Sequence, residues 1–258
     1  MPVPIIGVSI SLKPRHLHKE KLSIHRHLAV VLWLFAPLIV RAGDFRFEGG
    51  PQRVHLLELF TSQGCSSCPA AEAWLSKLKD EPRLWKDFVP LAFHVDYWDR
   101  LGWRDPFASK QWTARQYQYS SHWNSEGVYT PGFVLDGHEW LAREVPSSSS
   151  EKPGSLKLLI VNQKAVAEFV PSDGATKHVV DLHLATLGFD LSTKVTAGEN
   201  SGRNLHQDFI VLALTKQNMS AGKAEFAFNL DSRAGGIAAW ITAPNQIEPI
   251  QAVGGWLR

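Results

Sequence analysis

Cysteine is scarce in this sequence, with only Cys65 and Cys68 in a chain of 258 residues. A structural zinc site needs four ligands, usually from two Cys-x-x-Cys pairs, and the sequence has no second pair. Small domains that depend on disulfides carry several bridges, so that class is excluded as well. One Cys-x-x-Cys motif remains, and we expect the pair itself to have a function.

Long apolar runs are scarce too. One run of thirteen residues covers 28–40, whereas a membrane-spanning helix needs about 20. Basic residues precede this run, and small residues at Val40 and Ala42 fit the −3 and −1 positions of a cleavage site. The pattern predicts a signal peptide over 1–42, a periplasmic or secreted protein, and no stable membrane span after cleavage. An uncleaved anchor is the alternative.

The chain has no excess of positive charge once the predicted signal peptide is left out. Residues 1–42 hold six basic residues and one acidic residue, so the rest of the chain has a net charge of −3, against +2 for the whole sequence. Proteins that bind nucleic acid carry a basic patch that neutralises phosphates. We therefore expect no nucleic-acid partner.

The cysteines lie inside the most informative stretch, residues 53–79. An apolar run at 54–60 predicts a buried strand, and apolar residues at helical spacing follow the cysteines. Unpaired backbone N–H groups at the start of a helix stabilise a thiolate. We predict that Cys65, half exposed before the helix, attacks a substrate and that the more buried Cys68 resolves the mixed disulfide.

Other uses of the motif stay open at this point. The pair could bind a metal with His94 as a third ligand, although a fourth ligand would still be needed. It could also be an inert structural disulfide, although a bridge that closes so short a loop contributes little to stability.

A second apolar run at 88–95 predicts a parallel partner strand, reached through a right-handed crossover. Sites in open α/β sheets form at the carboxyl ends of parallel strands. The residues that end or follow this run should therefore lie near Cys65 as substrate-binding residues: His94, Asp96, Tyr97 and Trp98.

Three further residues are candidates for the chemistry. Glu58, on the first strand, could take up the proton of Cys68 if it is buried beneath the disulfide. It could instead be a partly exposed strand carboxylate. A cis bond between Thr130 and Pro131 would present the Thr130 backbone to the disulfide, and an ordinary trans turn proline is the alternative.

Residues 99–126 are an aromatic-rich insertion, with a helix expected to begin near Ser109. Aromatic residues are dense in it and include Trp98 just before it. They form either a ligand platform beside the cysteines or a satellite core under a long loop. They are Trp98, Trp103, Phe107, Trp112, Tyr117, Tyr119 and Trp123.

Near residue 177 the sequence pattern changes to alternating residues and glycine turns. Apolar spacing predicts a helix over 156–169, and alternating residues predict strands at 179–184, 192–196, 225–230, 236–242 and 249–253. Residues 207–215 fit a helix or a strand. We expect one domain over 43–172 and a second module over 173–258.

Five segments read ELFTSQGCSSCP (58–69), FHVDYWD (93–99), LGWRDPF (101–107), GVYTP (127–131) and GENSGRNL (198–205). They resemble the motifs of a family of secreted bacterial proteins, domain of unknown function 1223. The resemblance implies an α/β thioredoxin-like fold with an aromatic-rich insertion, followed by a smaller β-rich C-terminal module. It also implies export and supports a redox role.

Together these expectations describe an exported thiol–disulfide oxidoreductase. Its partner would be a protein or small-molecule disulfide or thiol, and it would need no cofactor and no metal. Two alternatives remain: capture of copper by the dithiol, with His94, and a non-catalytic interaction protein of the cell envelope.

Overall fold

The computed structural model describes residues 44–142, 144–174 and 179–257. The predicted signal peptide, 1–42, lies outside these residues. Within the described part of the chain, no helix is long and apolar enough to cross a membrane.

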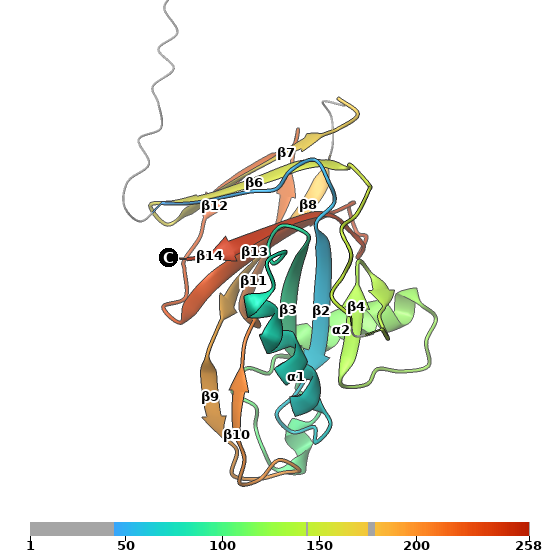
Figure 1. The fold of residues 1–258 in the computed structure, drawn as a ribbon, viewed down its shortest axis with the longest axis vertical. Helices are drawn as coiled ribbons and strands as arrows, with labels where there is room; N and C mark the ends of the chain where they lie inside the picture. Colours follow the sequence, from blue (N-terminus) through green and yellow to red (C-terminus); the bar gives the residue numbers. More distant parts are fainter. Residues whose placement is uncertain (1–43, 143, 175–178, 258) are drawn as a thin grey trace, which may run out of the picture. The chain divides into compact units, whose positions relative to one another are not determined.

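The fold is mixed α/β and is built on a mixed central sheet of eight strands (Figure 1). β2 lies parallel to β3, β3 lies parallel to β11, and the other neighbours are antiparallel. In sheet order the strands are β14 (Pro249–Trp256), β13 (Ala234–Thr242), β8 (Val180–Gly188), β11 (Ile210–Met219), β3 (Phe88–His94), β2 (His55–Thr61), β4 (Gly132–Leu135) and β5 (His138–Glu139).

A separate antiparallel sheet packs against one face of the central sheet. Its strands, in order, are β1 (Phe45–Glu48), β6 (Gly154–Val161), β7 (Lys164–Pro171) and β12 (Lys223–Ala227). The apolar core between the two sheets includes Leu156 and Leu158 from β6 and Leu182 and Leu184 from β8.

Two helices cover opposite faces of β2, because successive side chains of a strand point to opposite faces. Leu57 and Leu59 pack against α1 (Cys68–Lys77), which continues into the short 3-10 helix η1 (Leu78–Asp80). Leu56 and Phe60 belong to the cluster that holds α2 (Lys110–His122). This division decides which side chains of β2 lie near the cysteines.

The predicted helix over 156–169 is wrong, because this segment forms the hairpin of β6 and β7. Its burial alternates residue by residue, and the turn residues Asn162 and Gln163 have φ of 48° and 61°. Such a two-residue turn matches the twist of paired strands. Leu156, Leu159 and Ile160 fit helical spacing by coincidence.

Other predictions are confirmed. Ser109 caps α2, with its side chain accepting a hydrogen bond from the Gln111 N–H at 3.1 Å. The ambiguous segment 207–215 becomes a strand, β11, from Ile210 onward.

The predicted boundary at 172/173 falls between β7 and β8, and strands from both sides of it pair in both sheets. β3 pairs with β11 in the central sheet, and β7 pairs with β12 in the other. The division therefore stays a prediction about chain organisation and does not mark a break in either sheet.

A hairpin of β9 (Leu191–Lys194) and β10 (Asn204–Gln207) extends from the central sheet. Figure 1 shows it running beside α1, toward the end of the helix where the cysteines lie. The 3-10 helix η2 (Asp99–Leu101) opens the aromatic-rich insertion before α2.

Candidate functional site

The two cysteines are joined as a disulfide between the end of β2 and the start of α1, with their Cα atoms 5.4 Å apart. Cys68 is the first residue of α1, and Cys65 lies in the loop before it. The predicted order of strand, turn, Cys-x-x-Cys and helix is confirmed.

The predicted half-exposure of Cys65 is wrong. Cys65 is 1% exposed and Cys68 is 0% exposed, although Ser66 and Ser67 between them are exposed. The Ser67 hydroxyl lies 3.3 Å from Cys65 Sγ. In this structure a substrate can meet Ser66 and Ser67 but not the sulfur atoms.

The Thr130–Pro131 bond is cis, as one of the two sequence alternatives has it. The Thr130 carbonyl oxygen lies 3.8 Å from Cys65 Sγ. The Trp98 indole N–H donates to the Thr130 hydroxyl at 2.8 Å. Thr130 therefore lies beside the sulfur that the sequence assigns as the attacking atom, and Trp98 binds its side chain.

Glu58 does not lie beneath the disulfide. It is fully buried, on the face of β2 that α2 covers, whereas the helix of Cys68 covers the other face. Arg115 donates to its two carboxylate oxygens at 2.6 and 2.9 Å, and the Tyr119 hydroxyl donates to it as well. The carboxylate is held in a buried ion pair, so neither sequence alternative describes it.

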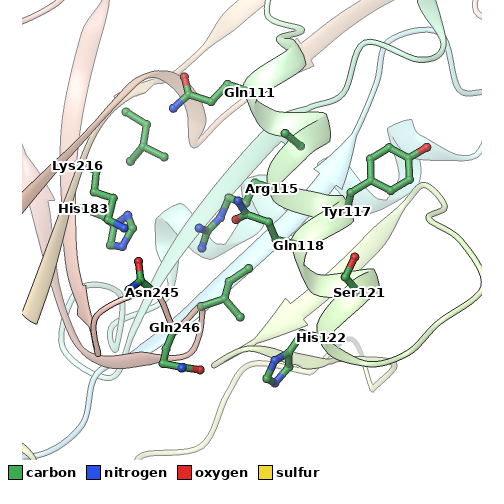
Figure 2. Close-up of a pocket in the computed structure, with 13 residues that line it drawn as sticks. Gln111, Arg115, Tyr117, Gln118, Ser121, His122, His183, Lys216, Asn245 and Gln246 are labelled. Atoms are coloured by element: carbon green, nitrogen blue, oxygen red, sulfur yellow. The ribbon is translucent and has the colours of Figure 1, made fainter.

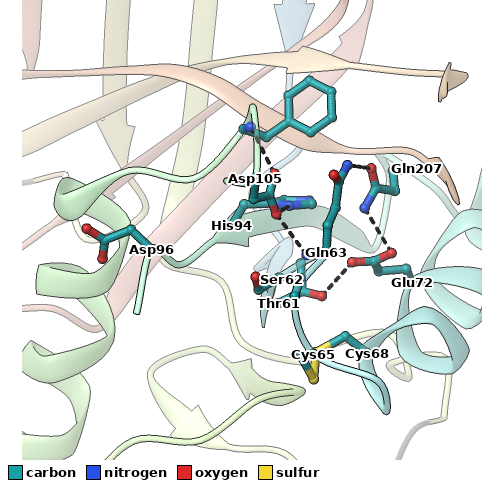
Figure 3. Close-up of polar contacts among 12 residues, drawn as sticks. Thr61, Ser62, Gln63, Cys65, Cys68, Glu72, His94, Asp96, Asp105 and Gln207 are labelled. Atoms are coloured by element: carbon teal, nitrogen blue, oxygen red, sulfur yellow. Dashed lines mark hydrogen bonds and ion pairs between the residues drawn. A yellow bond between two sulfur atoms is a disulfide. The ribbon is translucent and has the colours of Figure 1, made fainter. Parts of the chain in front are cut away.

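A carboxylate that the sequence analysis did not single out, Glu72, lies on the cysteine side. Glu72 is 5% exposed, one helical turn after Cys68 on the buried face of α1. It accepts hydrogen bonds from the Thr61 hydroxyl at 2.6 Å and from Gln207 Nε2 at 3.0 Å (Figure 3). The helical spacing from Cys68 could have identified it.

His94 is fully buried behind the cysteine loop and bonded to Asp105. Its Nδ1 donates to Asp105 Oδ2 at 2.7 Å, and the Gln63 N–H donates to the same oxygen at 2.8 Å (Figure 3). Burial opposes the charge on His94, but the Asp105 carboxylate outweighs it and raises the His94 pKa. Likewise burial opposes the charge on Asp105, and His94 overcomes this and lowers the Asp105 pKa.

The Gln63 side chain joins this pair to Glu72. Its Nε2 donates to Gln207 Oε1 at 2.8 Å, and its Oε1 accepts from the Trp103 indole at 3.0 Å. A continuous chain of polar contacts thus runs from His94 and Asp105 to Glu72 beneath the cysteine loop.

The other two predicted substrate-binding residues face α2. Asp96 accepts a hydrogen bond from the Thr113 hydroxyl at 2.6 Å, and Figure 3 shows it turned away from the cysteines. The Tyr97 hydroxyl donates to Gln116 Oε1 at 3.3 Å, and burial raises the pKa of Tyr97 to about 12. Of the four predicted residues, Trp98 has the most direct link to the cysteines. A substrate-binding role for any of them stays a prediction.

The turn between β9 and β10, in the C-terminal half of the chain, also contacts the cysteine loop. The Asn200 side chain donates to the carbonyl oxygens of Gln63 and Cys65, each at 2.9 Å. The Ser66 N–H donates to Glu199 Oε2 at 2.9 Å. The sequence marked this turn as a motif but gave no contact for it.

A separate groove of about 1050 Å³ lies between α2 and strands β8 and β11 (Figure 2). Neither cysteine lines it. His183 stacks on Trp240 there, with ring centres 5.0 Å apart, and burial lowers the pKa of His183 to about 3. Arg115 and Lys216 also line the groove, and both are paired with carboxylates.

Among the described residues, no group of three His, Cys, Asp or Glu side chains is arranged to hold a metal ion. His94, the third metal ligand considered from the sequence, uses its Nδ1 for Asp105.

Residues 56–241 match a family described as a protein of unknown function (DUF1223). Two solved structures are similar to this chain. Protein AGR_C_4864 from Agrobacterium tumefaciens is 23% identical, with a TM-score of 0.60 over 81% of this chain and 96% of that one. HBP35 of Porphyromonas gingivalis is 14% identical, with a TM-score of 0.52 over 81% of this chain and 76% of that one. At these identities the likeness shows the fold alone. No curated protein matches.

Proposed function

The chain belongs to the DUF1223 family, and on that premise we propose that it is an exported thiol–disulfide oxidoreductase. The observation that carries the proposal is the Cys65–Cys68 disulfide at the start of α1, with the Thr130 carbonyl 3.8 Å from Cys65 Sγ. The leader pattern in 1–42 supports export.

The arrangement of the first half of the chain supports a thioredoxin-like fold. β2, α1 and β3 form a parallel βαβ unit, and β4 and β5 add antiparallel strands on the other side of β2. The likeness to HBP35 agrees with this fold. A hairpin, β6–β7, stands where the sequence predicted the last helix.

The proposed reaction exchanges one disulfide for another. The Cys65 thiolate attacks a sulfur of the substrate disulfide, that S–S bond breaks, and one half of the substrate leaves as a thiolate. Cys68 then loses its proton and attacks Cys65 Sγ, which releases the second half. The protein dithiol is oxidised to a disulfide, the substrate disulfide is reduced to two thiols, and two protons pass to the products. The reverse sequence oxidises a dithiol substrate.

We assign the proton of Cys68 to Glu72 instead of Glu58. Glu72 shares the buried face of α1 with Cys68 and has no cation bonded to its carboxylate among the described contacts, which come from Thr61 and Gln207. Glu58 lies on the opposite face of β2 and is held by Arg115. Glu72 is therefore the carboxylate on the side of β2 where the proton of Cys68 must be taken up.

Replacing each cysteine in turn tests the proposal. Cys65→Ser should abolish reduction of a glutathione-based disulfide, because the attacking sulfur is lost. Cys68→Ser should accumulate a mixed disulfide on Cys65, because no sulfur remains to resolve it. Mass spectrometry of the trapped species and an exchange assay measure both results. Wild-type exchange rates in both variants would rule the function out.

A further inference from the structure

The turn between β9 and β10 is tied to the cysteine loop by the one buried side chain among residues 198–203. Asn200 is 1% exposed. Its amide donates to the carbonyl oxygens of Gln63 and Cys65, and its Oδ1 accepts from Arg203 at 2.8 Å. The carboxamide thus uses both N–H groups and its oxygen, which an aspartate of the same shape could not do because it cannot donate.

Glu199 places a negative charge on the loop. Its carboxylate accepts a hydrogen bond from the N–H of Ser66, the residue that follows Cys65. Backbone N–H groups at this end of a helix are the ones that stabilise a thiolate. When Cys65 is in the neutral disulfide, the Ser66 N–H is free to donate its hydrogen bond to Glu199. A Cys65 thiolate would repel the Glu199 carboxylate and would compete with it for the same N–H group.

Backbone hydrogen bonds within the hairpin brace the turn. The Gly202 N–H donates to the Val195 carbonyl at 2.9 Å, and the Val195 N–H donates to the Arg203 carbonyl at 2.9 Å. Its outward contacts to the cysteine loop are those of Asn200 and Glu199. Gly198, with φ of 72°, approaches Trp103 so closely that a Cβ there would lie 3.3 Å from Trp103 Cβ.

We infer that residues 198–203 are a redox-sensitive cover, which Asn200 and Glu199 hold closed over the disulfide and which the Cys65 thiolate releases. The inference rests on the proposed function, since a cover regulates the pair only if the pair exchanges. In the oxidised protein both sulfur atoms are buried, and the turn is bonded to the backbone of Gln63, Cys65 and Ser66. The coupling is reciprocal. If the thiolate favours the open turn, then the closed turn raises the free energy of the thiolate by the same amount.

Hydrogen exchange of the full chain tests the coupling. In the wild type, amides of 195–204 should exchange at least about tenfold faster after reduction than in the disulfide form, because the turn opens. Glu199→Gln keeps a similar shape but removes the charge, so the difference between the two redox states should shrink. Glu225→Gln, which removes an exposed carboxylate on β12, is the matched control and should keep the wild-type difference.

Accessibility gives a second measurement. Asn200→Ala should raise the rate at which glutathione reduces the disulfide by roughly tenfold, the effect of losing about one net hydrogen bond from the closed state. Ser201→Ala, in the same turn, removes a hydroxyl that donates to the Thr196 carbonyl, away from the cysteine loop, and should leave this rate unchanged. In Glu199→Gln, alkylation of Cys65 by iodoacetamide should begin at lower pH, and the reduction potential should become less negative, because the thiolate is less disfavoured.

The outcomes separate the cover from the proposed function. Equal exchange of 195–204 in the two redox states, with unchanged potential and alkylation profile in Glu199→Gln, would overturn the cover and leave the oxidoreductase intact. If glutathione reduces neither the wild type nor any variant, the oxidoreductase fails. Exchange in the chain reduced by a phosphine would then still decide whether the cover responds to the thiolate.

Discussion

At the scale of single residues, two buried carboxylates have opposite surroundings. Arg115 and Tyr119 hold Glu58 on the α2 side of β2, whereas Glu72 on the α1 side is bonded to the neutral groups of Thr61 and Gln207. Glu72 shares the buried face of α1 with Cys68, whereas Glu58 is held on the opposite side of β2. The two residues should therefore differ in their effect on the chemistry of Cys68.

Glu72→Gln should slow the second step of exchange, the attack of Cys68 on the mixed disulfide, by roughly a hundredfold near neutral pH. The amide cannot accept the proton of Cys68, so hydroxide must replace it and the rate should rise with pH. Rapid quenching of the mixed disulfide with glutathione, followed across neutral to alkaline pH, measures this step.

Glu81→Gln is the matched control, because Glu81 lies after η1 and pairs with Arg83. It should keep the wild-type rate and pH profile. A Glu72→Gln profile that matches the wild type would remove Glu72 from the proposed mechanism.

The sequence predicts those parts of the site that a local motif marks. Cys65 and Cys68 follow from one motif, and the place of Thr130 follows from a proline that opens a strand. Asn200 contacts the Cys65 carbonyl across 135 residues, and no local pattern encodes such a pairing. The alternative that puts Glu58 beneath the disulfide has the wrong face of β2, because a shift of one residue along a strand reverses the side-chain direction.

At the scale of elements, the segment 156–169 shows the limit of periodicity. Leu156, Leu158 and Ile160 alternate with half-buried residues, and Leu159 supplies the extra apolar position that imitates a helix. Short apolar runs leave helix and strand undecided until their partner is known. Here the partners are β1, β7 and the facing sheet.

The α2 helix is better specified, because its start is encoded locally by Ser109. Ser109→Ala should lower the free energy of unfolding by about 1 kcal/mol, since it removes the side-chain acceptor for the Gln111 N–H. Urea unfolding followed by circular dichroism measures the change. Ser149→Ala, in the loop before β6, is the control and should shift the free energy of unfolding by less than about 0.5 kcal/mol. Equal stability of wild type and Ser109→Ala would show that the cap contributes nothing.

At the scale of the whole molecule, the two halves of the chain share their hydrogen bonding and their core. β3 takes β11 as its neighbour, and the apolar side chains of β6 face those of β8. The sequence predicts the strands of the C-terminal half but not this sharing, because strand patterns do not say which sheet a strand joins. The matches to motifs along 58–205 agree with one family spanning both halves.

We predict that neither fragment 43–172 nor fragment 173–258 folds by itself. The first would leave the edge of β3 unpaired and the apolar face of β6 uncovered, and the second would lose the same contacts from the other side. Thermal unfolding of each fragment, followed by near-ultraviolet circular dichroism, should show no cooperative transition. A cooperative transition in the first fragment alone would support the division at 172/173 as a true domain boundary.

The contacts between the β9–β10 turn and the cysteine loop also have a consequence during synthesis, because their two partners are made at different times. Cys65 and Cys68 emerge from the ribosome well before Asn200, which lies 135 residues beyond Cys65. Contacts of such long range form late, because a long loop must close before they stabilise the chain. A nascent chain therefore presents its thiols uncovered, and the bond between them can form before the turn that shields it exists.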